Sequence, residues 1–313
     1  MKSDKFIGHL VRRLRWDEID GNFLVSIINI ARDEDIAGAG LKERPALARD
    51  ITTDTLTPHG LGRARLMARR DMCVCGLKMA ELILGVYSAR DGEGECSVRL
   101  MAADGERVEK GAPLAEISGP ARTMIRAERV MLNFLQHLSG VSTLTARYVE
   151  ALGDSESKIL DTRKTTPCFR ALEKYAVACG GAYTHRMGLF DRVMLKDNHL
   201  AASDATCAER LAEAVRSAKR MNPEFAVEVE VDELSQIPYV LEAEADVIMF
   251  DNFTMEELAH GVKIVDGRAW TEASGGITLD TVAEIGKVGV DFISSGALVH
   301  QSAWIDIGLD WEG

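Results

Sequence analysis

Polar residues that suit anion and metal binding recur directly after short apolar segments in the second half of the chain. These polar runs are residues 161–166 (DTRKTT), 196–199 (KDNH), 228–230 (EVE), 251–252 (DN), 274–276 (SGG) and 295–296 (SG). A single charged residue after a strand is usually a solvated turn. Independent turns would not supply cations, acids and glycine pairs so regularly, and the runs therefore predict one shared site.

The cations around this site predict an anionic ligand. They are Arg163, Lys164, Lys196 and, before the second apolar segment, His185 and Arg186. Arg129, on a long helical stretch upstream, is a further candidate. The whole chain has a formal net charge of −12, so the cations indicate a local pocket and not a basic protein. Arginine suits bidentate binding of carboxylate or phosphate, and lysine acts as a point charge.

The late glycine-containing runs predict a phosphate site. In α/β barrels the last strands commonly bind phosphate through backbone N–H groups. The residues in question are Ser274, Gly275, Gly276, Ser295 and Gly296. Glu230 and Asp251 are acids beside this region that could hold Mg²⁺, ribose hydroxyls or both. An acidic small molecule, a phosphorylated sugar and Mg²⁺ together indicate phosphoribosyl transfer.

The elements that must position these residues alternate between strand and helix. We predict strands at 158–162, 192–195, 226–231, 246–250, 270–273 and 291–294, and helices at 169–179, 206–220, 234–243, 255–265 and 279–288. Strand–helix repetition means a parallel sheet, whose carboxyl strand ends meet at one edge. Six such units predict an α/β barrel, complete or partial.

The first part of the chain has a different pattern. Helical periodicity at 6–15, 22–32 and 76–88 mixes with short alternating segments at 65–68 and 97–101. A long helical stretch covers 120–151, with Gly140 expected to interrupt it. Residues 104–119 resemble one hammerhead hairpin of a lipoyl or biotinyl carrier domain, which leaves a non-enzymatic carrier module open as an alternative.

Composition excludes several classes of protein. The negative net charge argues against general binding to nucleic acid or an anionic membrane. The longest apolar runs, such as 247–250, are far shorter than a membrane span. None of the six cysteines forms a C-x-x-C pair, and the N-terminus lacks the apolar core of a secretory signal. We therefore expect a cytoplasmic protein with reduced thiols.

Several of these stretches, in order, resemble the quinolinate phosphoribosyltransferase family. The matching segments include 127–140 (AERVMLNFLQHLSG), 160–167 (LDTRKTTP), 185–189 (HRMGL), 195–199 (LKDNH), 251–252 (DN), 272–278 (EASGGIT) and 296–300 (GALVH). The resemblance implies an α/β protein with an N-terminal α/β sandwich over residues 1–128 and an α/β barrel over 129–296. It also implies that a tail over 297–313 returns to the first domain.

The reaction that the resemblance implies joins quinolinate to phosphoribosyl pyrophosphate and gives nicotinate mononucleotide, pyrophosphate and CO₂, with Mg²⁺. In that scheme the quinolinate carboxylates and nearby phosphates are bound by Arg163, Lys164, His185, Arg186 and Lys196. Arg129 would reach the partner subunit's site in a homodimer. Glu230 and Asp251 would contact the ribose hydroxyls and the metal, and with Lys164 are the expected catalytic residues. Ser274, Gly275, Gly276, Ser295 and Gly296 would cradle the 5′-phosphate.

Three positions depart from the usual family pattern. Cys168 replaces a glycine, Thr184 an asparagine, and Ser295 a valine. Two rival functions also stay open. One is a related pyrophosphorylase-like protein with another substrate. The other is a Schiff-base aldolase with Lys164 or Lys196 as nucleophile.

Overall fold

The computed structural model describes residues 2, 4–56, 60–196 and 208–312, which fold into two compact units. We call the first the parallel-sheet unit; it holds residues 1–14, 145–170 and 182–301. The second, the antiparallel-sheet unit, holds residues 15–144, 171–181 and 302–313. Each unit is described by itself, and the domain boundaries expected from the sequence stay a prediction.

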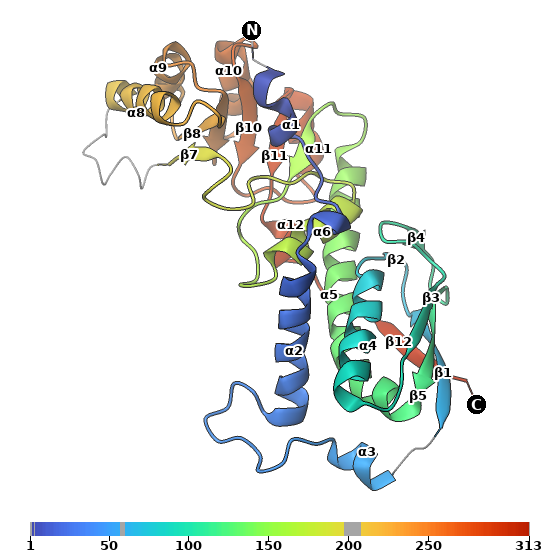
Figure 1. Cartoon of the computed structure of the whole chain (residues 1–313). Helices are drawn as coiled ribbons and strands as arrows, with labels where there is room; N and C mark the ends of the chain where they lie inside the picture. Colours follow the sequence, from blue (N-terminus) through green and yellow to red (C-terminus); the bar gives the residue numbers. More distant parts are fainter. Residues whose placement is uncertain (1, 3, 57–59, 197–207, 313) are drawn as a thin grey trace. The chain divides into compact units, whose positions relative to one another are not determined.

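The parallel-sheet unit is built on six strands in the order β6-β11-β10-β9-β8-β7, all parallel (Figure 1). The strands are β6 (Lys158–Leu160), β7 (Val193–Leu195), β8 (Val227–Val231), β9 (Val247–Asp251), β10 (Trp270–Ser274) and β11 (Phe292–Ser294). All six predicted strands are confirmed to within two residues. Among the described residues β6 and β7 do not pair with each other, so the predicted barrel is the partial form.

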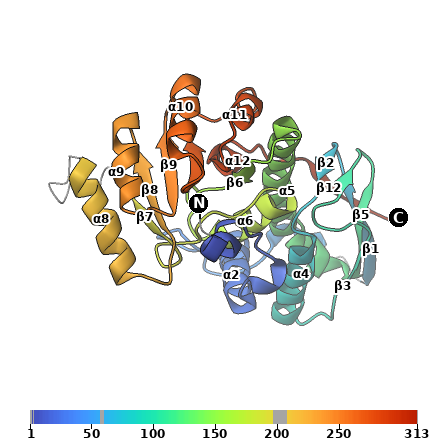
Figure 2. The ribbon, with the colours of Figure 1, turned by 90° about the horizontal axis from the view of Figure 1, so that it is seen from above.

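Helices connect these strands and cover the outer side of the sheet, as Figure 2 shows for α8 to α11. They are α8 (Ala208–Met221), η3 (Leu234–Gln236), α9 (Ile237–Glu242), α10 (Met255–Val265) and α11 (Val282–Val288), and a short helix α12 (Ala297–His300) follows the last strand β11. The predicted start of α8 at residue 206 lies outside the described residues. Helix α11 begins later than predicted because Thr278 and Thr281 form a turn first, with the Thr278 N–H donating to Thr281 Oγ1 at 3.0 Å.

The first helix of the chain ends earlier than the sequence predicts. The elements η1 (Asp4–Phe6) and α1 (Ile7–Leu10) replace the predicted helix over 6–15. Phe6 and Leu10 are buried in the core of the parallel-sheet unit with Leu160, Val247 and Phe292 among others. Beyond Leu10 the chain leaves the helix because residue 12 pairs with another part of this unit.

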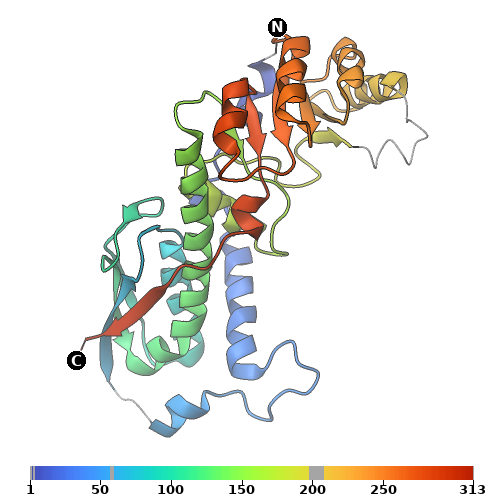
Figure 3. The same ribbon diagram turned by 180° about the vertical axis from the view of Figure 1, so that it is seen from behind.

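The antiparallel-sheet unit is built on four strands in the order β12-β1-β5-β3. These are β12 (Ile307–Trp311), β1 (Leu61–Ala68), β5 (Pro113–Pro120) and β3 (Ser97–Leu100), and a small ribbon pairs β2 (Met72–Cys73) with β4 (Arg107–Val108). The C-terminal strand β12 pairs with β1, as Figure 3 shows. Strand β5 is central in this sheet, which favours a structural role for residues 104–119 over a carrier hairpin.

The remaining helices are η2 (Trp16–Glu18), α2 (Gly21–Ala37), α3 (Ile51–Leu56), α4 (Leu77–Asp91), α5 (Ala121–Leu152) and α6 (Arg170–Cys179). Helix α5 runs unbroken through Gly140, so the predicted interruption there is wrong. A Cβ at Gly140 would lie 2.2 Å from the Ala303 carbonyl oxygen. Gly140 therefore lets the C-terminal segment pass close to the helix, which is a packing role and not a helix break.

Membrane insertion has no support in the described helices. None of them is both long enough and apolar enough to cross a bilayer.

Candidate active site

A cavity of about 700 Å³ lies at the carboxyl ends of the parallel strands. Its volume is in the range of small-molecule binding sites. It gathers all the site residues predicted from sequence except Arg129 and Glu230. Its lining comprises Thr162, Arg163, Lys164, His185, Arg186, Met194, Lys196, Met249, Asp251, Asn252, Ser274, Gly275, Gly276, Ile277, Thr278, Ser294, Ser295, Gly296, Ala297, His300 and Gln301.

One end of the cavity is formed by the turns after β10 and β11. Gly275 has φ +91°, and a Cβ there would lie 2.1 Å from Asn252 Oδ1. The Asn252 N–H donates to the Ser274 carbonyl oxygen at 3.0 Å, which ties this turn to the end of β9. Only glycine meets both the backbone conformation and the close contact at position 275.

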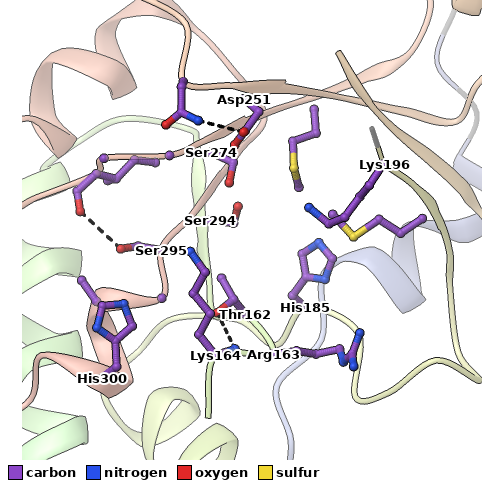
Figure 4. Close-up of a pocket in the computed structure, with 18 of the residues that line it drawn as sticks. Thr162, Arg163, Lys164, His185, Lys196, Asp251, Ser274, Ser294, Ser295 and His300 are labelled. Atoms are coloured by element: carbon purple, nitrogen blue, oxygen red, sulfur yellow. Dashed lines mark hydrogen bonds between the residues drawn. The ribbon is translucent and has the colours of Figure 1, made fainter. Parts of the chain in front are cut away.

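The turn after β6 places Arg163 and Lys164. The Lys164 N–H donates to Thr162 Oγ1 at 3.0 Å, and the Thr165 N–H to the Arg163 carbonyl oxygen at 2.9 Å. Figure 4 shows the Lys164 side chain running toward Ser294 and Ser295, while Arg163 runs to the opposite side beneath His185. Arg163 Nε is buried and has no acceptor among the described residues. These two cations therefore serve different ends of the cavity.

Asp251 is the one acidic residue among the described residues that line the cavity. It ends β9, and Asn252 Nδ2 donates to its Oδ2 at 2.8 Å (Figure 4). Asn252 has φ +56°, which turns the chain sharply at the strand end. One carboxylate faces several cations here, so the cavity favours a ligand with more than one negative charge.

Glu230 and Lys196 form an ion pair at the side of β7 and β8. The Lys196 ammonium donates to Glu230 Oε2, and Glu230 is buried and is not among the lining residues. Arg129 is exposed on the part of α5 that belongs to the antiparallel-sheet unit. The roles expected for Glu230 and Arg129 stay predictions. Residues 197–199, expected near the site, lie outside the described residues.

A buried charge cluster lies behind His185, and sequence reasoning missed it. Its members are His185, Glu228, Glu272 and Arg192. His185 Nε2 is 3.3 Å from Glu228 Oε1 and 3.5 Å from Glu272 Oε1. Arg192 Nη1 donates to Glu228 Oε2 at 2.9 Å and lies 3.2 Å from His185 Nε2. The available signal was the presence of two glutamates inside fully buried strands, where unpaired carboxylates are rare.

Charge in this cluster shifts the titration of its members. Burial and Arg192 oppose protonation of His185, but Glu228 and Glu272 outweigh them and raise its pKa above 6.5. Burial would raise the pKa of Glu228, but His185 and Arg192 lower it to about 2. Burial and the nearby Arg163 and Arg192 lower the pKa of Arg186 from its ordinary value. The cluster thus favours a charged Glu228 carboxylate and shifts the His185 ring toward its protonated form.

Backbone contacts fix the His185 ring and the peptide before it. The His185 N–H donates to Asp161 Oδ1 at 2.8 Å. The Arg186 N–H donates to His185 Nδ1 at 2.8 Å, a contact that favours an unprotonated Nδ1 and so works against the two carboxylates. We expect the carboxylates to prevail because two buried anions act on the ring and Arg192 neutralises only one of them.

Comparison with known proteins finds two family matches along the chain. The family described as "Quinolinate phosphoribosyl transferase, N-terminal domain" matches residues 50–139. Its counterpart, "Quinolinate phosphoribosyl transferase, C-terminal domain", matches residues 141–310. Together the two matches include most of both folded units and leave residues 1–49 outside.

Individual relatives are similar over most of their length. The nicotinate-nucleotide pyrophosphorylase [carboxylating] of Mycobacterium leprae is 39% identical over 83% of this chain and 90% of its own. The probable enzyme of the same name from Bacillus subtilis is 39% identical over 83% of this chain and 87% of its own. The solved structure of the nicotinate-nucleotide pyrophosphorylase from Francisella tularensis has a TM-score of 0.83 and 32% identity, covering 96% of this chain and all of that one.

Proposed function

The chain belongs to the quinolinate phosphoribosyltransferase family, and we propose that its cavity transfers a phosphoribosyl group from phosphoribosyl pyrophosphate to quinolinate with loss of CO₂. The products are nicotinate mononucleotide and pyrophosphate, as in the de novo synthesis of NAD. The observation that carries the proposal is one cavity that gathers cations, glycine turns and, among the described residues, a single carboxylate.

The cationic side suits the dicarboxylate. Arg163, Arg186 and Lys196 line the cavity around His185. Arg163 has a buried Nε that finds no acceptor in the described chain, so an incoming carboxylate would satisfy it. Quinolinate matches paired cations better than nicotinate does, because quinolinate has two carboxylates and nicotinate has one. Clamping both groups also fixes the ring for attack through its nitrogen.

The turns after β10 and β11 suit the 5′-phosphate of the sugar. Ser274, Gly275, Gly276, Ser295 and Gly296 line the cavity on this side, and their N–H groups would bind phosphate oxygens. Lys164 crosses from the turn after β6, and a Cβ at Gly296 would lie 2.7 Å from its Cδ. The lysine side chain therefore rests on Gly296, where its ammonium can meet phosphate oxygens as a point charge.

The chemistry needs charge stabilisation more than proton transfer. Departure of pyrophosphate from the sugar C1 leaves oxocarbenium character, and the Asp251 carboxylate, which lines the cavity, would stabilise positive charge there. The pyridine nitrogen then bonds to C1 and the ring becomes cationic. That cation accepts the electron pair released when the adjacent C–CO₂ bond breaks, and the ring carbon takes up a proton. Cations around the departing pyrophosphate lower the cost of its charge.

Mg²⁺ is part of this proposal. The lining residues fit it because Asp251 offers one carboxylate and Mg²⁺ is commonly held by one or two carboxylates together with substrate phosphates. Glu230, the second acid expected for the metal, is held by Lys196. When bound with phosphoribosyl pyrophosphate, the ion would neutralise charge on the leaving group.

We further propose a homodimer in which Arg129 enters the partner subunit's site. Its exposed position and its place on α5 within the family-matching segment support this. A cytoplasmic setting is proposed as well, supported by free thiols at Cys73, Cys75, Cys96, Cys168 and Cys179.

An assay of purified protein with Mg²⁺, phosphoribosyl pyrophosphate and quinolinate tests the reaction, with nicotinate as the control substrate. We expect nicotinate mononucleotide and CO₂ in equal amounts from quinolinate and no product from nicotinate. Product from neither substrate, with the protein folded, would contradict the proposal. Borohydride trapping of Lys164 or Lys196 with a carbonyl substrate would instead support the aldolase.

Mixed dimers test the role of Arg129. Arg129→Ala and Lys164→Ala should each be nearly inactive alone. After subunit exchange, about half the dimers are mixed and each holds one intact site, so activity should return to about a quarter of wild type. An absence of recovery in dimers shown to be mixed would remove Arg129 from the partner's site.

A further inference from the structure

We call residues 2 and 4–14 the N-terminal strap, and its residues 12–14 are hydrogen bonded to the chain directly before His185. The Thr184 N–H donates to the Arg12 carbonyl oxygen at 2.8 Å, and the Leu14 N–H donates to Thr184 Oγ1 at 3.3 Å. Arg12 and Thr184 form an antiparallel bridge. Thr184 is almost fully buried, at 1% exposure. Its side chain and backbone are therefore both engaged by the strap.

The strap also contacts the two residues before Thr184. Arg13 Nε donates to the Ala182 carbonyl oxygen at 3.2 Å, and the Arg13 guanidinium lies 4.4 Å from the centre of the Tyr183 ring. On its other side Tyr183 bonds to the β6 region: its N–H donates to the Ile159 carbonyl oxygen at 2.8 Å. Residues 182–184 are thus held between β6 and the strap through two isolated bridges, Tyr183 with Leu160 and Thr184 with Arg12.

Separate contacts anchor the first part of the strap in the core. Phe6 and Leu10 are buried against Leu160, Val247 and Phe292. The Lys2 ammonium pairs with Asp291 and lies 4.1 Å from the centre of the Trp270 ring. A core-anchored segment can hold its neighbour in place, because moving it would expose this apolar surface.

The position of the contact connects the strap to the cavity. His185 and Arg186 follow Thr184 immediately and both line the cavity. The His185 N–H is held by Asp161, which lies at the end of β6. The peptide that carries the two ligand-facing side chains is therefore fixed by β6 on one side and by the strap on the other.

We propose that the N-terminal strap is a positioning element for quinolinate binding, acting through Thr184 on His185 and Arg186. The inference rests on the function proposed above. Residues 1–49 lie outside both family matches, so the family assignment gives the strap no role. Thr184 is also one of the three departures from the family pattern, and its hydroxyl accepts the bond from the strap. A displacement of about 1 Å at an orienting residue is enough to reduce turnover strongly.

The matched pair Thr184→Val and Thr271→Val tests this proposal. Both replace a buried threonine hydroxyl in the parallel-sheet unit, but Thr271 lies at the start of β10 and bonds to Asp291, the partner of Lys2, and not to strap residues 12–14. We expect Thr184→Val to raise the KM for quinolinate about five- to tenfold, from the loss of one buried hydrogen bond, and to change the KM for phosphoribosyl pyrophosphate less than about twofold. Thr271→Val should lower stability and leave both KM values near wild type.

Two further variants make the test specific. Thr184→Ser keeps the acceptor oxygen and should have the same KM for quinolinate as the wild type. Arg13→Met changes an exposed strap residue and should raise that KM about two- to threefold, from the loss of its hydrogen bond to the Ala182 carbonyl and its contact with the Tyr183 ring. Hydrogen exchange gives a readout independent of activity: backbone amides of residues 183–186 should exchange faster in Thr184→Val and Arg13→Met than in Thr271→Val.

The outcomes separate the two proposals. If the wild type converts quinolinate and Thr184→Val behaves like Thr271→Val, the strap is structural only and the inference is overturned. Equal rises in both KM values would also overturn it, as would unchanged exchange of residues 183–186. A wild type that neither binds nor converts quinolinate would overturn the proposed function and the inference together.

Discussion

Arg192 and Glu228 form a fully buried ion pair directly behind His185, with Arg192 Nη1 2.9 Å from Glu228 Oε2. The two side chains are 3% and 0% exposed. Glu272 adds a second buried carboxylate within 3.5 Å of the same histidine. A cavity that receives a dianion thus has two buried carboxylates next to one of its lining residues. Arg192, together with His185, offsets their negative charge.

Removing Arg192 should therefore destabilise the protein strongly. Arg192→Met leaves Glu228 and Glu272 buried with less compensation, and we expect a loss of about 3–5 kcal/mol in the free energy of unfolding. The double variant Arg192→Met/Glu228→Met should recover much of that loss, because no charge of the pair is then left unpaired. Urea unfolding measures both. A double variant no more stable than Arg192→Met would show that the pair is not the source of the loss.

The raised pKa of His185 predicts a pH effect on stability. A raised folded pKa means that the contribution of the protonated ring is fully present below pH 6.5, its unfolded value, and is lost as pH rises through the higher folded pKa. Unfolding free energies from pH 5 to 9 should thus decline above pH 6.5 in the wild type and less in His185→Gln. His260→Gln, at an exposed position on α10, is the control and should follow the wild type. Parallel profiles for His185→Gln and wild type would contradict the prediction.

Gly275 should tolerate no side chain. An alanine there has an unfavourable φ and places Cβ 2.1 Å from Asn252 Oδ1, which must move and take the end of β9 with it. We expect Gly275→Ala to lower kcat/KM for phosphoribosyl pyrophosphate by about 100-fold. Gly289→Ala, with φ +87° and open space around it, carries the same backbone cost away from the cavity and should leave kinetics unchanged. Similar kinetics in the two variants would refute the steric argument.

Cys168 carries a backbone conformation that suits glycine. It has φ +66° and is exposed in the loop after the DTRKTTP segment. A left-handed backbone conformation costs a non-glycine residue about 1–2 kcal/mol. A glycine avoids that cost, but its greater flexibility in the unfolded chain cancels part of the gain. Cys168→Gly should thus gain about 0.5–1 kcal/mol and a higher melting temperature. Cys168→Ala removes the thiol but keeps the strain, so it should gain nothing, and an equal gain would implicate the thiol instead.

Two helical glycines should respond to alanine in opposite directions. Gly85 in α4 is exposed, and a Cβ added there would have no atom within 4 Å. Gly85→Ala should therefore stabilise the protein by about 1 kcal/mol through its higher helix propensity. At Gly140 in α5 the Cβ would lie 2.2 Å from the Ala303 carbonyl oxygen. Gly140→Ala should destabilise and loosen the attachment of β12, which hydrogen exchange of residues 307–311 would detect. Stabilisation at both sites would show that the C-terminal segment yields without cost.

Most of the cavity could be predicted from sequence because its residues follow strands whose apolar character is local. Each short strand contains apolar residues that can be recognised locally, and parallel strands bring their carboxyl ends to one edge whatever the details of packing. Arg163, Lys164, Asp251 and the glycine turns needed no further information. The family motifs then narrowed the prediction from an acidic small molecule and a phosphorylated sugar to quinolinate and phosphoribosyl pyrophosphate.

The remaining features depend on contacts between residues far apart in the chain. Glu228, Glu272 and Arg192 come from separate strands or loops, and only the packed sheet brings their charges within hydrogen-bond distance. The strap behaves likewise, because helical periodicity at residues 6–15 cannot reveal that residue 12 will pair with Thr184. The sequence predicted a helix break at Gly140 because it could not show that Ala303, which is distant in sequence, packs closely against this glycine. Local patterns determined the strands and the chemistry at their ends, and tertiary packing decided which distant groups support them.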